Sequence, residues 1–152
     1  MAVIAAGQPV PEVSLARFEA EPFTRVDLLG RTTVLVFYPF AFSPVCTDQL
    51  AVYDAVLEDF AERGVTLYGV SCDAVWSQQA FREQLGIRIE QLSDFEPKGA
   101  VCRALGVLHP GGFPKRALIL VGEDGVVRWS YEAPSPSELP GANLIFDALD
   151  GR

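Results

Sequence analysis

Two short apolar runs joined by one amphipathic segment constrain the fold of this chain most strongly. The run Thr33–Tyr38, TVLVFY, is rich in β-branched and aromatic residues, which is typical of a strand covered on both faces. Asp48–Arg63 has apolar residues at helical spacing and ends before Gly64, and Val65–Ser71 reads as a second buried strand. A strand, a helix and a strand in this order predict parallel pairing through a right-handed crossover.

The rest of the chain predicts further elements around this unit. They are a hairpin of short strands within Val13–Leu29, a helix at Trp76–Leu85, a hairpin of Ala117–Val121 and Val126–Trp129 around GEDG, and a terminal helix at Ser135–Leu149 that Pro140 either begins or breaks. No repeat or low-complexity linker divides the 152 residues. We therefore expect one α/β domain over residues 1–152, with a mixed central sheet, flanking helices and an N-terminal β-hairpin.

Charge and hydropathy exclude several classes of function. The formal net charge is −8, from 20 acidic and 12 basic residues, and no basic cluster is present, so nucleic acid is not an expected partner. Although 49% of the residues are hydrophobic, no uncharged apolar run approaches the roughly 18 residues that span a bilayer. The first residues lack the features of a signal peptide. We expect a cytoplasmic protein without a membrane partner.

The cysteines do not form a structural framework. There are three, Cys46, Cys72 and Cys102, none in a C-x-x-C pair. With a single histidine, His109, in a loop sequence, the chain lacks a ligand set of the usual zinc spacing. We expect no metal site of this kind, and a thiol that is kept reduced.

Cys46 is the candidate nucleophile. It lies at the N-terminus of the predicted helix, where unpaired amides and the helix dipole favour a thiolate, and it follows the carboxyl end of a buried strand. From this position alone, a small buried packing residue is an equally good interpretation. The neighbours favour chemistry: Pro39 and Pro44 stiffen the preceding loop, Ser43 supplies a hydroxyl, and Arg116 stands at the start of another buried strand.

These residues carry a family resemblance. Pro39, Ser43 and Cys46 spell P-x-x-x-S-x-x-C and, together with Arg116, resemble the active-site signature of the peroxiredoxins. The segments GQPVPEVSL, LSDFEPKGAVCRALGV and KRALILVGEDGVVRW extend the resemblance along most of the chain. The last two segments and the short C-terminus are most similar to the one-cysteine alkyl hydroperoxide reductase E-like branch. The resemblance implies a thioredoxin-like fold.

The resemblance also implies a thiol-dependent peroxidase with an antioxidant role. Cys46 would be the peroxidatic nucleophile that attacks a hydroperoxide, with donors from Arg116, the Ser43 hydroxyl and the Cys46 amide. Pro39 would shield the pocket from water. The product would be a cysteine sulfenic acid that an external thiol or a redoxin reduces, with no cofactor.

Departures from the family pattern bear on the subtype. Gln49 stands where many members carry glutamate, and Ala51 stands where one branch places a second cysteine. We interpret Cys72 and Cys102 as small packing residues, which favours a one-cysteine cycle. The alternatives are a two-cysteine enzyme in which Cys72, or less plausibly Cys102, resolves the sulfenic acid, and a non-catalytic redox-sensing or holdase module on the same fold.

Aromatic residues near the active-site loop have two interpretations. Phe40, Phe42, Trp76 and Phe81 are either core residues or an exposed patch. The family resemblance favours a patch at a dimer face, and we expect a homodimer.

Overall fold

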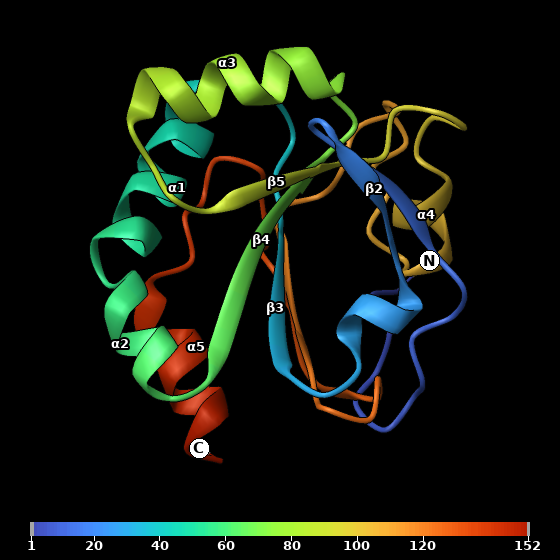
Figure 1. The fold of residues 1–152 in the computed structure, drawn as a ribbon, viewed down its shortest axis with the longest axis vertical. Coiled ribbons are helices and arrows are strands. Elements are labelled where there is room, and N and C mark those ends of the chain that lie inside the picture. The colour runs from blue at the N-terminus through green and yellow to red at the C-terminus, as the bar shows by residue number, and fades with distance from the viewer. Residues whose placement is uncertain (1, 152) are drawn as a thin grey trace.

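The computed structural model describes residues 2–151 and shows one twisted sheet covered by helices on both faces (Figure 1). Its seven strands lie in the order β2-β1-β5-β4-β3-β6-β7. The strands are β1 Ser14–Arg17, β2 Ala20–Thr24, β3 Thr32–Phe37, β4 Val65–Ser71, β5 Glu90–Ser93, β6 Ala117–Val121 and β7 Val127–Glu132. The strand pairs β3–β4 and β4–β5 are parallel, whereas β3–β6, β6–β7 and β1–β2 are antiparallel. The predicted mixed α/β sheet with an N-terminal hairpin is confirmed.

The helices form two unequal layers. They are α1 Pro44–Ala55, α2 Leu57–Glu62, α3 Val75–Leu85, α4 Ala100–Ala104, α5 Ala142–Leu149 and the short 3-10 helix η1 Arg25–Leu28. In Figure 1, α1, α2 and α5 lie on one side of the sheet, and α4 lies on the other. Among residues 2–151, every helix is too short or too polar to cross a lipid bilayer.

Two predicted helices have different boundaries in the structure. The segment predicted as Asp48–Arg63 begins earlier, at Pro44, and is interrupted at Val56, whose backbone leaves the helical region (φ −115°, ψ 21°). Proline fits the first helical position because its missing N–H would have no partner there. The segment predicted as Ser135–Leu149 is helical only from Ala142, because Pro140 cannot continue a helix. The short strand β5 has no clear signal in the sequence.

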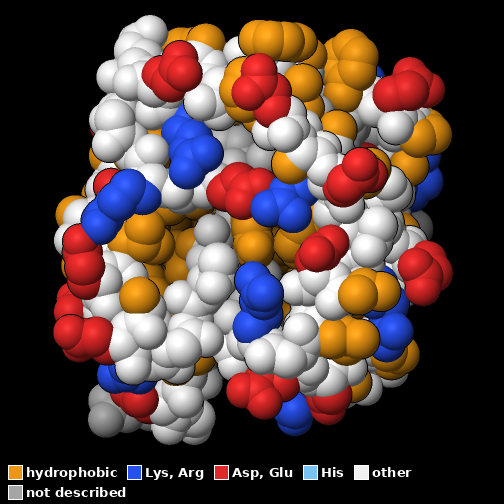
Figure 2. All heavy atoms as spheres, viewed as in Figure 1, with side chains coloured by type: hydrophobic (Ala, Val, Ile, Leu, Met, Phe, Trp, Pro, Cys, Tyr) orange, Lys and Arg blue, Asp and Glu red, His pale blue; other side chains and the backbone are white. Residues whose placement is uncertain are grey.

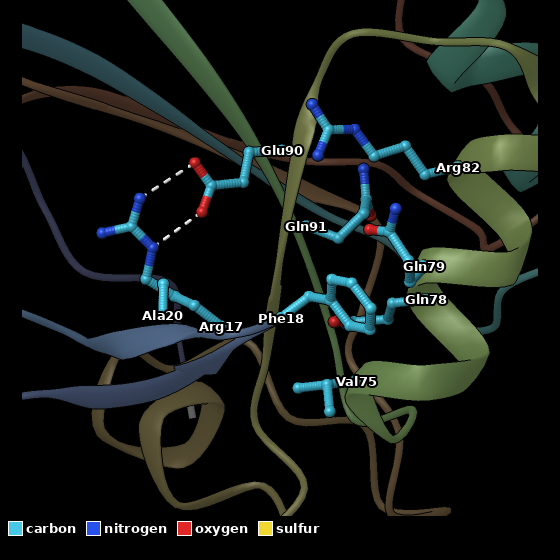
Figure 3. Close-up of a pocket in the computed structure, with 9 residues that line it drawn as sticks. All are labelled: Arg17, Phe18, Ala20, Val75, Gln78, Gln79, Arg82, Glu90 and Gln91. Carbon is cyan, nitrogen blue, oxygen red and sulfur yellow. Dashed lines mark hydrogen bonds and ion pairs between the residues drawn. The ribbon is translucent and has the colours of Figure 1, made fainter.

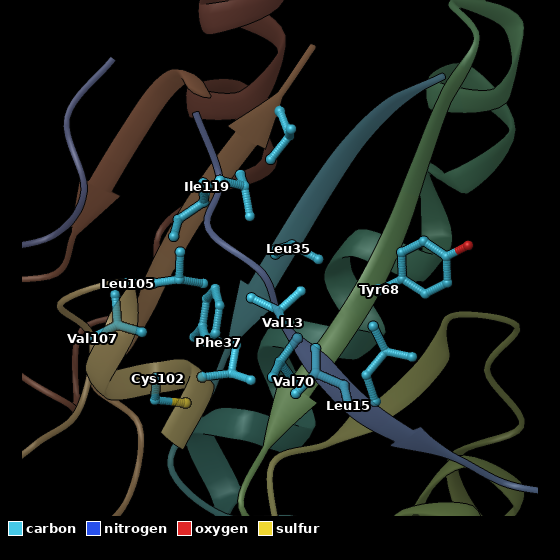
Figure 4. Packing of buried hydrophobic residues seen from close by; sticks show 14 of the residues in the cluster. Val13, Leu15, Leu35, Phe37, Tyr68, Val70, Cys102, Leu105, Val107 and Ile119 are labelled. Atoms are coloured by element: carbon cyan, nitrogen blue, oxygen red, sulfur yellow. The ribbon is translucent and has the colours of Figure 1, made fainter. Parts of the chain in front are cut away.

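Side-chain alternation along β3 divides the core into two clusters. Val34 and Val36 face α1, α2 and α5, whereas Leu35 and Phe37 face the layer that contains α4. The cluster that contains Leu35 and Phe37 is shown in Figure 4, where Cys102 from α4 points toward Phe37 and Val70. Because successive residues of a strand point to opposite faces, the two clusters are separated by the sheet itself.

Candidate active site

Cys46 lies in the first turn of α1, directly beyond the carboxyl end of β3. Ser43 is the N-cap residue, Pro44 begins the helix, and the Cys46 side chain is fully buried at 0% exposure. The amides of Val45 and Cys46 belong to the first-turn N–H groups that have no acceptor within the helix. The thiol therefore sits at the positive end of the helix dipole, where a developing negative charge is stabilised.

Arg116 approaches the same sulfur from the neighbouring strand. It precedes β6, which pairs with β3, and its side chain is almost completely buried. Its Nη2 donates to Cys46 Sγ at 3.3 Å, Nη1 donates to Gln49 Oε1 at 2.6 Å, and Nε donates to the Pro136 carbonyl at 2.7 Å. With all three nitrogens bound, the guanidinium has a fixed orientation. The structure thus brings together Cys46 and Arg116, which are 70 residues apart in the chain.

Two polar residues that the sequence analysis did not select complete this network. Gln49 Nε2 donates to the Tyr53 hydroxyl at 3.1 Å, and that hydroxyl donates to the Pro140 carbonyl at 2.6 Å. Burial raises the pKa of Tyr53 to about 12, so its hydroxyl stays protonated and can donate at neutral pH. Gln49 and Tyr53 follow Cys46 by three and seven residues on one helix face. This spacing is a signal that could have identified them from the sequence.

Replacing Tyr53 with phenylalanine is expected to lower the free energy of unfolding by about 1–3 kcal/mol, because a buried carbonyl and an amide lose their partner. Urea denaturation followed by circular dichroism measures this change. Tyr68→Phe is the matched control, since its hydroxyl points away from the core cluster in Figure 4. Equal stability of the Tyr53→Phe variant and the wild type would show that the Tyr53 hydroxyl contributes nothing.

Ser43 and Pro39 frame the loop that leads to Cys46. The Ser43 hydroxyl donates to the Phe40 carbonyl at 3.0 Å and does not cap α1. Pro39 is buried two residues after the end of β3. Between them, Phe42 adopts a left-handed backbone conformation with φ +73°. Such a conformation is strained for a residue with a bulky side chain and often occurs near functional sites.

Asp73 holds this loop against the end of β4. Its Oδ2 accepts hydrogen bonds from the Ala41 amide at 2.8 Å and from the Ser71 hydroxyl at 2.7 Å. Asp73 was not selected from the sequence, because an acidic residue after a strand has no distinctive pattern. Its contribution follows from the pairing of β3 with β4, which brings the two strand ends together.

Cys72 lies on the opposite face of the sheet from Cys46. Cys46 packs in the cluster with Val34 and Val36, whereas Cys72 and Cys102 pack in the cluster with Phe37. All three cysteines are free thiols. A disulfide between Cys46 and Cys72 would require the loops at this end of the sheet to rearrange.

The aromatic residues near the loop divide between surface and core. Phe40 and Phe42 are about half exposed, and Trp76 is 70% exposed. Phe81 is buried and packs against Tyr38, so the interpretation of Phe81 as part of an exposed patch is wrong. The reason is its position on the inner face of α3. His109, in the predicted loop, is half-buried and stacks on Phe113.

A pocket between the β1–β2 hairpin, β5 and α3 is separate from this site (Figure 3). It is lined by Phe18 and Gln78 and by the ion pair of Arg17 with Glu90. In this ion pair, Arg17 Nε lies 2.7 Å from Glu90 Oε2. Its lining includes neither Cys46 nor Arg116. On the face shown in Figure 2, acidic and basic side chains alternate without a continuous basic stripe. Neither feature offers a second centre for thiol chemistry.

The fold and the site together define a thioredoxin-like protein with a cysteine–arginine pair at the N-terminus of its first long helix. The chain matches the AhpC/TSA family over residues 6–130, and it belongs to this family.

Curated relatives are consistent with this assignment. The chain is 30% identical over 128 residues to a protein of Thermotoga maritima named peroxiredoxin, covering 80% of this chain and 60% of the relative. It is 33% identical over 122 residues to 1-Cys peroxiredoxin A of Oryza sativa, covering 72% of this chain and 56% of the relative. It is 30% identical over 131 residues to the putative peroxiredoxin bcp of Coxiella burnetii, covering 82% and 85%. The chain thus spans about 60% of the length of several of these relatives.

Solved structures share the fold. Enterococcus faecalis AhpC superposes with a TM-score of 0.88 at 24% identity, over 99% of this chain and 92% of the other. Peroxidoxin BcpB from Mycobacterium tuberculosis superposes with a TM-score of 0.84 at 26% identity, over 97% of both chains. The thioredoxin-like fold is therefore confirmed, and peroxiredoxin relatives carry it.

Proposed function

We propose that this protein is a thiol-dependent peroxidase that reduces hydrogen peroxide and organic hydroperoxides through Cys46. The observation that carries the proposal is the 3.3 Å contact between Arg116 Nη2 and Cys46 Sγ, at a helix N-terminus, in a chain of the AhpC/TSA family. A fixed guanidinium and unpaired amides stabilise both a thiolate and the negative charge that develops on a leaving oxygen.

The reaction follows from this geometry. The Cys46 thiolate attacks one oxygen of the hydroperoxide, the S–O bond forms, and the O–O bond breaks. The electron pair of the O–O bond stays on the leaving oxygen, which takes a proton and departs as an alcohol or water. Arg116 and the Cys46 amide donate to the oxygens along this line. The product is a sulfenic acid on Cys46.

Substrate entry requires a change in the loop before α1. Cys46 is fully buried, so a peroxide reaches the sulfur only when the Pro39–Ser43 segment or the first turn of α1 moves. The backbone of Phe42 is strained, which favours such a movement, and the movement breaks the hydrogen bond from the Ser43 hydroxyl to the Phe40 carbonyl. In the moved state, the Ser43 hydroxyl is free to bind the peroxide, and Pro39 limits the entry of water.

A one-cysteine cycle is the better proposal for regeneration. The packing of Cys72 and Cys102 on the other face of the sheet supports it, because neither thiol lies beside Cys46. A low-molecular-weight thiol or a redoxin then attacks the Cys46 sulfenic acid and releases water, and a second thiol restores the free cysteine. That the chain is most similar to the one-cysteine alkyl hydroperoxide reductase E-like branch stays a prediction. Demonstration of a one-cysteine cycle would support it.

A homodimer is the proposed assembly. The half-exposed rings of Phe40 and Phe42 lie beside the active-site loop, and exposed aromatic groups of this kind favour protein–protein contact. The dimer would cover these rings and restrict access to the Cys46 loop.

The subtype is tested by the intact mass of the reduced protein after one equivalent of hydrogen peroxide, without a reductant. We expect a gain of one oxygen that peptide mapping places on Cys46, in a form that a sulfenic-acid reagent traps. The reason is that no thiol packs against Cys46 to consume the sulfenic acid. A loss of two hydrogens with Cys46 joined to Cys72 would replace the one-cysteine cycle by the two-cysteine alternative.

A further inference from the structure

The two remaining cysteines form a separate cluster that the proposed peroxidase cycle does not use. Cys72 follows β4 and Cys102 lies in α4, and the fold brings their sulfur atoms and a carboxylate oxygen of Asp94 within 4.8 Å of one another. The 29 intervening residues separate the two cysteines too widely for a C-x-x-C motif. It exists because α4 packs against the end of β4.

The two thiols have different access to the outside. Cys102 is fully buried, in the core cluster shown in Figure 4. Cys72 is 8% exposed and lines a pocket of about 310 Å³ together with Phe95 and Lys98. Pro39 lines the same pocket from the loop before α1. A small molecule in this pocket therefore meets Cys72 first.

The pKa values of the two thiols are shifted in opposite directions. The hydrogen bond from the Cys102 thiol lowers the pKa of Cys72, and the Lys98 ammonium adds to this effect, whereas burial and the Asp94 carboxylate oppose it. The same hydrogen bond, together with burial, raises the pKa of Cys102. A thiolate is the reactive form of cysteine, and Cys72 lines the pocket whereas Cys102 is fully buried, so Cys72 is the nucleophile of the pair.

Asp94 is held in place by the start of α4. Its Oδ1 accepts from the Val101 amide at 3.1 Å, and its Oδ2 accepts from the Cys102 amide at 2.8 Å. Both oxygens are thus engaged by backbone donors, and the carboxylate fixes the position of Cys102. Two thiols and one carboxylate could also hold a zinc ion, but a carboxylate committed to two amides is a poorer metal ligand than a free one.

We propose that Cys72 and Cys102 form a second redox centre, which closes to an intramolecular disulfide when a hydroperoxide enters the pocket beside Cys72. The Cys72 thiolate attacks the peroxide, and the O–O bond breaks to give a sulfenic acid and an alcohol or water. Cys102 then attacks the Cys72 sulfur, an S–S bond forms, and the hydroxyl leaves with the Cys102 proton as water. The two thiols are oxidised by two electrons, and the hydroperoxide is reduced.

Closure needs only a small movement. The two sulfur atoms are less than 4.8 Å apart, so they must approach by less than about 3 Å to reach the length of an S–S bond. This centre goes beyond the proposed peroxidase, because its chemistry does not involve Cys46 and takes place on the other face of the sheet.

The test uses the full chain with Cys46→Ser, in which the pair is the remaining source of thiols. After treatment with excess hydrogen peroxide, we expect the intact protein to lose two hydrogens and both titratable thiols. Non-reducing peptide mapping should join the peptides that contain Cys72 and Cys102. Dithiothreitol should restore both thiols. Peroxide consumption by wild-type Cys46 is measured separately, so failure of one proposal is distinguishable from failure of the other.

Two control variants assign the roles within the pair. In Cys46→Ser/Cys102→Ala, Cys72 should gain one oxygen that a sulfenic-acid reagent traps. In Cys46→Ser/Cys72→Ala, Cys102 should remain a free thiol. If a variant does not fold, the same non-reducing peptide mapping is done on oxidised wild-type protein, which needs no substitution. Persistence of both thiols in Cys46→Ser after excess peroxide would overturn the proposal, as would one tightly bound zinc ion per chain that masks them.

Discussion

The Cys46→Ser variant is expected to consume hydrogen peroxide at least about 1,000-fold more slowly than the wild type, because loss of a catalytic nucleophile removes the chemical step itself. A serine hydroxyl at this position remains protonated at neutral pH and does not cleave a peroxide bond. The measurement is the initial rate of peroxide loss with reduced protein and an excess of a small thiol.

The substitution is conservative in size, so the fold should be retained. Circular dichroism and urea denaturation check this, since Cys46 is fully buried and a hydroxyl is more polar than a thiol. The rate is measured during the first turnover, and titration of the Cys72 and Cys102 thiols gives the share that this pair contributes. A Cys46→Ser protein that consumes peroxide as fast as the wild type would refute the proposed function.

The Arg116→Lys variant is expected to lose about 100- to 1,000-fold in kcat/KM for hydrogen peroxide, the range that follows removal of one charge-stabilising donor. Lysine keeps the positive charge, but its single nitrogen cannot bind Cys46, Gln49 and the Pro136 carbonyl in the forked geometry of the guanidinium. Stopped-flow measurement of peroxide consumption over a range of peroxide concentrations gives kcat/KM, and urea denaturation checks that the variant is folded.

Arg128→Lys is the matched control for this variant. Arg128 is exposed on β7 and forms an ion pair with Asp124 at 3.2 Å, far from the thiol in the fold. The Arg128→Lys variant should retain the wild-type rate, because an exposed ion pair of this kind contributes little to stability. If Arg116→Lys retained more than a third of the wild-type kcat/KM, the fixed guanidinium would not be the source of the rate.

Much of the fold was predictable because its elements carry local signals. The bounds of β4 and β6 match the predictions, since continuous runs of β-branched and aliphatic residues between turn residues define buried strands. The short strand β5 was missed. Its four residues include Glu90 and Gln91, and it is a strand because it pairs with β4. The break in the first helix at Val56 was also missed, because no proline or glycine marks it in the sequence.

For the site, the sequence by itself determined which residues are the candidates for the chemistry. The residues around Cys46, and their resemblance together with Arg116 to the peroxiredoxin signature, selected both. Only the tertiary structure decided which groups meet. It placed Arg116 between Cys46 and Gln49, and it placed Cys72 beside Cys102 on the other face. The physical reason is that side-chain direction alternates along each strand, while contacts between distant segments depend on how strands pair and helices pack.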